Sequence, residues 1–262
     1  MNSFVILFAS AVLFVTSIAI DYCNLDLCPE NRLHVGCAEN SSDWGPDCSD
    51  DSYFEEMTKE LKNFILKKHN KARNKIALGK VPGYLEADRM PEMVWNTELE
   101  ETAELNAKRC KYGHDECRNT DKFRSVGQNI GIVTSNHTYF HKVTNVIGLY
   151  FDLWFEEYKD CNMSYIDDYQ LLENKEVKIG HFTQIVAMKA KYVGCAMSKF
   201  LSGEHYEMNF YLVCNYSFGN RVSEPIYTTG PAASRCNSGR SLYYKGLCNS
   251  TEDIEEISDN VD

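Results

Sequence analysis

Eleven cysteines constrain the fold of this 262-residue chain more than any other feature. So many thiols point to an oxidising compartment and a disulfide framework, and because the number is odd, one cysteine is left over. No pair has the Cys-x-x-Cys spacing of many zinc sites, so metal binding by cysteines is the weaker interpretation. The eleven are Cys23, Cys28, Cys37, Cys48, Cys110, Cys117, Cys161, Cys195, Cys214, Cys236 and Cys248.

The N-terminal residues predict export. Residues 1–19, MNSFVILFASAVLFVTSIA, form an apolar run without charged side chains that is too short to span a bilayer, and they end in small residues. We interpret them as a signal peptide and place the start of the mature chain near Ile20. No later stretch approaches the roughly 20 apolar residues of a membrane helix. We therefore expect a secreted, extracellular protein with no transmembrane segment.

Five Asn-x-Ser/Thr sequons are a second indication of export, because such asparagines are glycosylated in the secretory pathway. We expect two or three of them to carry glycans. The five are Asn40, Asn136, Asn162, Asn215 and Asn249.

The distribution of charge argues against a nucleic-acid partner. The net charge is −11, and no stripe of basic residues interleaves with aromatic ones. Residues 249–262 carry six acids and no base, with few large apolar groups. These residues are expected to form an acidic, disordered tail.

Hydrophobic periodicity predicts helices followed by strands. Apolar residues at helical spacing, beginning with Phe54 and Met57 and ending before Gly79, predict a long amphipathic helix. Thr97 resembles the first residue of a capping box that opens a second helix. A short β-branched strand is expected from Val126 to Thr134, and a third helix follows it.

Two apolar and aromatic runs, residues 192–200 and 206–218, flank the Gly-containing turn LSGEH and predict a β-hairpin. Cys195 and Cys214 fall on its two arms, where a cross-strand disulfide is plausible. Residues 20–52 lack periodicity and are interpreted as an N-terminal arm held by disulfides. Helices and strands do not alternate as βαβ units, so the expected class is α+β with helices on a mostly antiparallel sheet.

Several ordered motifs resemble those of the CAP superfamily, which groups cysteine-rich secretory proteins, antigen 5 and class 1 pathogenesis-related proteins. The resemblance covers roughly residues 55–230, and the N-terminal arm and the C-terminal end narrow it to fly-type antigen 5-related proteins. The motifs are His69-Asn70-x-x-Arg73, Met93-Val94-Trp95, Leu105-Asn106-Ala107, Gly127-Gln128-Asn129, Trp154-x-x-Glu157, Gly180-His181-Phe182-Thr183-Gln184-Ile185-Val186 and Cys214-Asn215-Tyr216.

This resemblance implies a three-layer α-β-α sandwich over residues 53–230. Residues 231–248, which contain Cys236 and Cys248, are interpreted from their own sequence as a C-terminal disulfide loop. The resemblance also implies four disulfides, whereas a fifth, between Cys236 and Cys248, is inferred from their spacing. The four implied pairs are Cys23 with Cys37, Cys28 with Cys117, Cys48 with Cys110, and Cys195 with Cys214.

Cys161 is then the cysteine without a partner. One interpretation is a buried thiol at the end of the third helix. The other is a disulfide between two copies of the chain, a dimer contact, which the neighbouring Asn162 sequon favours because it suggests an exposed surface.

Many members of the superfamily have two histidines and two glutamates around a central cavity. By resemblance, the cavity residues of this chain are His114, Gln128, Glu157 and His181, with Gln128 where a glutamate is usual. The two imidazoles and the carboxylate of Glu157 match an open three-ligand zinc site, although glutamine is a poor zinc ligand. The alternative is a hydrogen-bonded polar network that needs no metal, because buried polar groups require partners.

Catalysis is the least supported reading of these residues. In superfamily members proposed to be proteases a serine follows the first cavity histidine, whereas this chain has Asp115. Neither Gly-x-Ser-x-Gly nor His-Glu-x-x-His occurs. A metal-assisted hydrolase or redox enzyme using His114, Glu157 and His181 remains the alternative from another class.

The leading hypothesis is a secreted, non-enzymatic antigen 5-like protein of saliva, venom or a reproductive secretion. No cofactor is expected, and a weakly bound zinc or other divalent metal is the alternative. Its partner is an extracellular protein or a hydrophobic, lipid-like ligand. A third hypothesis is sterol or lipid binding in defence, suggested by relatives with that role.

Overall fold

The computed structural model describes residues 21–37, 43–135, 142–172, 176–202 and 207–254. The expected signal peptide and the sequons at Asn40 and Asn136 lie outside the described residues. Within the described part of the chain, no helix is both long enough and apolar enough to cross a membrane.

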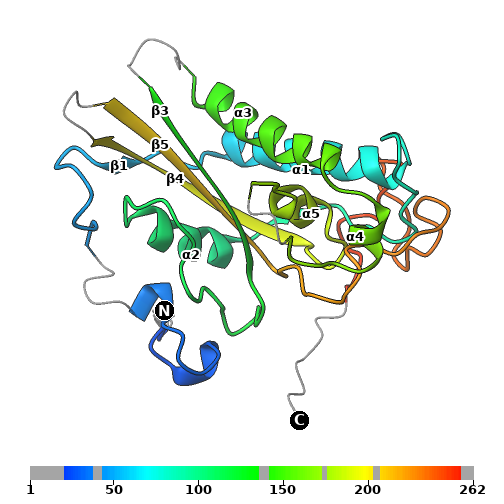
Figure 1. Ribbon diagram of the computed structural model, residues 1–262, viewed down its shortest axis with the longest axis horizontal. Coiled ribbons are helices and arrows are strands. Elements are labelled where there is room, and N and C mark those ends of the chain that lie inside the picture. The colour runs from blue at the N-terminus through cyan, green and yellow to red at the C-terminus, as the bar shows by residue number, and fades with distance from the viewer. Residues whose placement is uncertain (1–20, 38–42, 136–141, 173–175, 203–206, 255–262) are drawn as a thin grey trace, which may run out of the picture.

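A mostly antiparallel sheet forms the middle of the molecule (Figure 1). β3 (Gly127–Ser135) pairs with β5 (Glu207–Tyr216), which pairs with β4 (Tyr192–Ser202). β4 also pairs with two short strands, antiparallel with β1 (Tyr53–Phe54) and parallel with β2 (Val94–Trp95). The predicted hairpin and the predicted strand after residue 126 are both present.

Helices cover both faces of this sheet, which confirms the α+β class and the three-layer α-β-α arrangement (Figure 1). α1 (Lys59–Ala77), α3 (Val143–Glu156) and α5 (Gly180–Val186) lie on one face, and α2 (Thr97–Ala107) lies on the other. The shorter elements are α4 (Met163–Asp167) and the 3₁₀ turns η1 (Leu25–Leu27), η2 (Val35–Cys37) and η3 (Glu157–Lys159).

Alternation along the strands divides the core into two layers. In β5, Phe210 and Leu212 pack in the cluster shared with α1, α3 and α5, whereas Tyr211 and Val213 pack against α2. This is the two-residue period of a strand buried on both faces.

The start of α1 and the capping residue of α2 differ from the sequence prediction. Phe54 belongs to β1, and α1 begins at Lys59 because the hydroxyl of Thr58 accepts the N–H of Leu61. α2 does begin at Thr97, but its cap is Asn96, whose Oδ1 accepts the N–H of Leu99 at 2.9 Å. An asparagine one residue earlier therefore takes the place of the expected capping box.

The motif His69-Asn70-x-x-Arg73 is structural. His69 and Asn70 are buried in α1, where the ring of His69 bonds to Ile65 O and Tyr216 Oη at 3.0 Å each. The amide of Asn70 accepts the N–H of Met93 and donates to its carbonyl. Burial lowers the pKa of His69 to about 3, so this histidine is neutral and joins layers of the fold.

The structure contains five disulfides, and they join the five pairs expected from the sequence. Cys195 and Cys214 lie directly opposite each other in β4 and β5. Two other disulfides tie the N-terminal arm to the His114 loop (residues 108–126), which connects α2 to β3. These two are Cys48–Cys110 and Cys28–Cys117.

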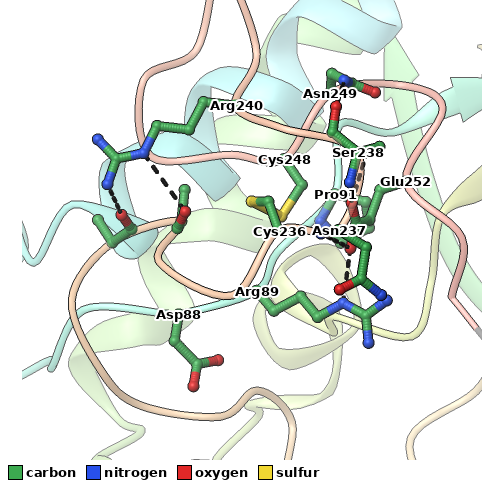
Figure 2. Close-up of a disulfide and its surroundings, with 12 residues drawn as sticks. Asp88, Arg89, Pro91, Cys236, Asn237, Ser238, Arg240, Cys248, Asn249 and Glu252 are labelled. Carbon is green, nitrogen blue, oxygen red and sulfur yellow. Dashed lines mark hydrogen bonds and ion pairs between the residues drawn. A yellow bond between two sulfur atoms is a disulfide. The ribbon is translucent and has the colours of Figure 1, made fainter.

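The start of the predicted acidic tail is ordered, which corrects the prediction for residues 249–254. Beside the Cys236–Cys248 disulfide, the side chain of Glu252 is completely buried (Figure 2). Its carboxylate accepts hydrogen bonds from Arg89 Nε at 2.7 Å, from Ser238 Oγ at 2.6 Å and from backbone N–H groups. An acidic residue in a polar tail is thus a fixed part of the C-terminal fold.

We expect Glu252→Gln to lower the free energy of unfolding at pH 7 by about 2 kcal/mol. Burial raises the pKa of Glu252, but hydrogen bonds from Ser238, Asn237 and Arg89 outweigh it and bring the pKa to about 2, below the usual 4.5. The folded state therefore gains stability above pH 4.5 and loses this gain as the pH falls towards 2. Urea denaturation of wild type and variant at pH 6 and pH 3 should show a smaller difference at pH 3.

Asp253→Asn is the matched control for this experiment, because Asp253 is exposed and contacts Arg89 only through its backbone carbonyl. Its effect should be within about 0.5 kcal/mol at both pH values. A difference between wild type and the Glu252 variant that stays constant from pH 6 to pH 3 would contradict the prediction.

Candidate functional site

A cleft of about 660 Å³ lies where the His114 loop, β3 and the start of α5 meet. Three of the four predicted cavity residues, His114, Gln128 and His181, line it. The fourth, Glu157, contacts His181 from behind. The structure therefore brings together side chains that are 67 positions apart in the sequence, from His114 to His181.

His181 is held by Glu157 and Trp154. Its Nδ1 lies 2.6 Å from Glu157 Oε1, while Glu157 Oε2 accepts the backbone N–H groups of His181 and Phe182 at 2.9 and 3.1 Å. The Trp154 indole stacks on the imidazole, with centroids 5.5 Å apart. Because a carboxylate only accepts, Nδ1 carries the proton in the neutral ring and the lone pair is on Nε2.

Both oxygens of Glu157 are thus engaged with the backbone and ring of α5. Glu157 is therefore the residue that orients the ring of His181. Carboxylates in this position commonly orient metal-binding histidines.

His114 is held in a similar way by an amide. Its Nδ1 lies 2.7 Å from Gln128 Oε1, which can only accept, so the lone pair is again on Nε2. Burial lowers the pKa of His114, and the hydrogen bond to Gln128 opposes this only in part. The imidazole is therefore neutral at pH 7, the form that binds cations.

A carboxylate that sequence reasoning did not place in the site lies behind Gln128. Gln128 Nε2 donates to Asp115 Oδ2 at 2.9 Å and to Asn215 Oδ1 at 3.0 Å. Asp115 is buried and also pairs with Arg118, whose Nε lies 2.7 Å from Oδ1. Its only signal in the sequence was its place directly after His114.

Among the described residues that line the cleft, His114 and His181 are the side chains best suited to bind a metal ion. No group of three or more His, Cys, Asp or Glu side chains is placed there to hold a metal ion. The nearby hydroxyl of Thr183 donates to Ile179 O at 2.8 Å, so it is not paired with either histidine as a nucleophile would be.

Cys161 is a buried free thiol, at 6% exposed, which agrees with the first of the two interpretations given for the leftover cysteine. Burial raises its pKa to about 11, so the reactive thiolate is scarce at neutral pH. The observation favours the interpretation of a buried thiol over a disulfide between two copies.

The described sequons differ in accessibility. Asn215 is completely buried in β5, and its Nδ2 donates to Thr102 Oγ1 at 3.0 Å, so the fold has no room for a glycan there. Asn215, which the sequence analysis included among the candidate glycosylation sites, is therefore not glycosylated in this fold. Asn162 is exposed and caps α4, and Asn249 is half-buried with its Nδ2 bonded to Ser238 O.

Comparisons with known proteins agree with this architecture. A model of the cysteine-rich secretory protein family, CAP, matches residues 66–216. Venom allergen-1 of Aedes aegypti is 39% identical over 254 residues, 97% of each chain. Antigen 5 like allergen Cul n 1 of Culicoides nubeculosus is 39% identical over 216 residues, 78% of this chain and 93% of the relative.

Solved structures with a similar fold are also found. The crystal structure of NaASP2 with Zn²⁺ is similar with a TM-score of 0.56 and 25% identity, over 77% of this chain and 99% of that one. The crystal structure of Na-ASP-1 has a TM-score of 0.62 and 25% identity, over 78% of this chain and 50% of that one.

Proposed function

The chain belongs to the CAP family of cysteine-rich secretory proteins, and from this premise we propose that it is a secreted, non-enzymatic binding protein of an extracellular fluid. Relatives named venom allergen and antigen 5 like allergen support the proposal, as do the five disulfides. The absence of a nucleophile bonded to His114 or His181, among the residues described, favours binding over hydrolysis.

The cleft is the proposed binding site, and its best-supported occupant is a divalent cation with a preference for imidazole, such as zinc. The observation that supports this is a pair of cleft histidines whose Nδ1 atoms are both held by acceptor oxygens. The lone pair of each neutral ring is then on Nε2, the atom that can bind a metal. Zinc usually takes at least three protein ligands, so a two-histidine site should bind weakly and keep positions for water or a ligand. A bound zinc would supply a positive centre that attracts donor groups of such a ligand.

A sterol or other lipid fits the cleft less well. Besides the two histidines, its walls include Arg118 and amide side chains such as Asn129 and Gln184, with apolar residues on only part of the lining. A lipid would leave such polar groups without partners, which costs free energy.

A protein partner is supported by a different feature. Leu242 and Tyr243, on the loop closed by Cys236–Cys248, are 91% and 85% exposed. The Ser241 hydroxyl accepts the N–H groups of Tyr243 and Tyr244, so the backbone of this tip is fixed. A rigid, exposed pair of apolar and aromatic side chains is typical of residues that anchor protein interfaces.

We expect zinc to stabilise the protein against urea, and the stabilisation to disappear in the His114→Ala/His181→Ala double variant. At a zinc concentration about ten times the dissociation constant the gain is about 1.4 kcal/mol. It should weaken below pH 6, because ligating imidazoles must be neutral. Isothermal titration calorimetry gives the affinity directly.

Tyr243→Ser, which changes a residue outside the cleft lining, is the control and should respond to zinc as the wild type does. The proposed site is wrong if zinc stabilises the wild type no more than the double histidine variant. Because both histidines supply one ligand each, either single variant alone should weaken binding.

A further inference from the structure

The orientation of the Gln128 side chain is determined by the groups behind it. A glutamine amide has one donor end and one acceptor end. Its Nε2 faces two acceptors, Asp115 Oδ2 at 2.9 Å and Asn215 Oδ1 at 3.0 Å. Asn215 is itself oriented, because its Nδ2 donates to Thr102 Oγ1 at 3.0 Å. Only Oε1 of Gln128 is therefore available to His114.

The carboxylate of Asp115 is itself held in place by hydrogen-bond donors. Its side chain is only 3% exposed, Arg118 Nε donates to Oδ1 at 2.7 Å, and Asn106 Nδ2 donates to Oδ2 at 2.5 Å. All its neighbours are donors, so the carboxylate cannot be exchanged for an amide without placing an NH₂ group against another donor.

We propose that Asp115 is a positioning residue, which holds the Gln128 amide in the orientation that gives His114 a proton on Nδ1 and a lone pair on Nε2. If the amide turned over, its NH₂ would donate to Nδ1, the proton of the ring would move to Nε2, and the only lone pair would be on Nδ1, already used by the amide. The use of that lone pair for a cation rests on the proposed function. The positioning itself does not.

Each histidine of the site is thus oriented by a carboxylate. Glu157 bonds directly to the ring of His181, whereas Asp115 acts on the ring of His114 through the amide of Gln128. A glutamate at position 128 would instead place two carboxylates against each other at the 2.9 Å contact.

The test compares Asp115→Asn, Gln128→Glu and the double variant in the metal-free protein, with the tautomer of His114 read from ¹⁵N NMR of the ring. In Asp115→Asn the new amide should keep its oxygen on Arg118 and turn its NH₂ towards Gln128. Asn215 Oδ1 alone then holds the Gln128 amide in its present orientation. We expect a measurable fraction of the protein to have Gln128 turned over and His114 in the Nε2-protonated form. The double variant should restore the Nδ1-protonated form, because the new asparagine donates to the new glutamate.

Zinc titration of the same variants is the second measurement. We expect binding to weaken about tenfold in Asp115→Asn and to return to within about threefold of wild type in the double variant. If zinc binds no wild-type protein but the tautomer changes as described, the cation proposal fails and the positioning role stands. If His114 keeps its proton on Nδ1 in folded Asp115→Asn, the positioning role is overturned.

Asp121→Asn is the matched control, because Asp121 also pairs with an arginine three residues later, but on the surface, with a side chain 73% exposed. It should leave the His114 tautomer unchanged. Should Asp115→Asn fail to fold, Gln128→Leu cuts the same link and leaves the pair of Asp115 and Arg118 intact. In that variant, too, an unchanged Nδ1-protonated ring would overturn the proposal.

Discussion

Arg73→Met is expected to lower the free energy of unfolding by about 4 kcal/mol, a large part of the stability of a typical domain. Arg73 is completely buried in α1, and burial lowers its pKa to about 9. No carboxylate among the described residues pairs with it. Its guanidinium instead donates to three backbone carbonyls, those of Pro91, Ile185 and Ala187, at 2.8 to 3.1 Å.

These carbonyls explain the size of the effect. Arg73 joins α1 to the end of α5 and to the segment before β2, and methionine would leave Pro91 O and Ile185 O without the donor that now satisfies them. Each unsatisfied buried carbonyl costs about 1–3 kcal/mol. Carbonyls near the C-terminal end of a helix also carry partial negative charge, which stabilises the buried cation.

Urea denaturation at pH 7 measures the change, with Arg32→Met as the control because the side chain of Arg32 is exposed. The control should stay within about 0.5 kcal/mol of wild type. Arg73→Lys keeps the charge but not the planar set of donors, so about half of the loss should remain. If Arg73→Met unfolds within about 1 kcal/mol of wild type, the carbonyl contacts do not carry the stability assigned to them.

Gly194→Ala should be the other severe substitution, with a loss of at least about 3 kcal/mol. Gly194 lies in β4 beneath the start of α2, and a Cβ there would lie 2.5 Å from Asn96 O and from Leu99 C, and closer still to Glu100 N. These are backbone atoms of a capped helix and cannot move aside as a flexible side chain can. The glycine lets α2 pack directly against the sheet.

Gly180→Ala is the matched control, because a Cβ at Gly180 would meet nothing within 4 Å. This glycine is the first residue of α5, where alanine is the better helix former, so a neutral or slightly favourable change is expected. The midpoint of thermal unfolding, recorded at one protein concentration, compares the two. Equal midpoints for both variants would show that α2 can move away from β4 at little cost.

The sequence predicted the parts of the fold that local patterns and motifs determine. The hairpin containing Cys195 and Cys214 followed from two apolar runs around a turn. The predicted start of α1 was too early, because Thr58 caps that helix, whereas for α2 only the identity of the cap differed. The motifs that resemble the CAP family then supplied the layers and the cavity residues.

What the sequence could not predict depends on contacts between distant segments. α5 has only seven residues and no side-chain cap, so periodicity gives it almost no signal. Glu252 looks like part of an acidic tail until Arg89 and Ser238 are seen around it. Asp115 appeared only as a residue where a serine was expected, because its link to Gln128 spans 13 positions and two elements.

The His114 loop has no helix or strand of its own, and the Cys48–Cys110 and Cys28–Cys117 disulfides fasten it to the N-terminal arm. Oxidation therefore contributes to one wall of the cleft, beside the hydrogen bonds that Gln128 and Asp115 make. The same polypeptide made in a reducing cytosol would lack these two disulfides, and His114 would depend on those hydrogen bonds alone. The redox state of the compartment thus affects how firmly the wall is held.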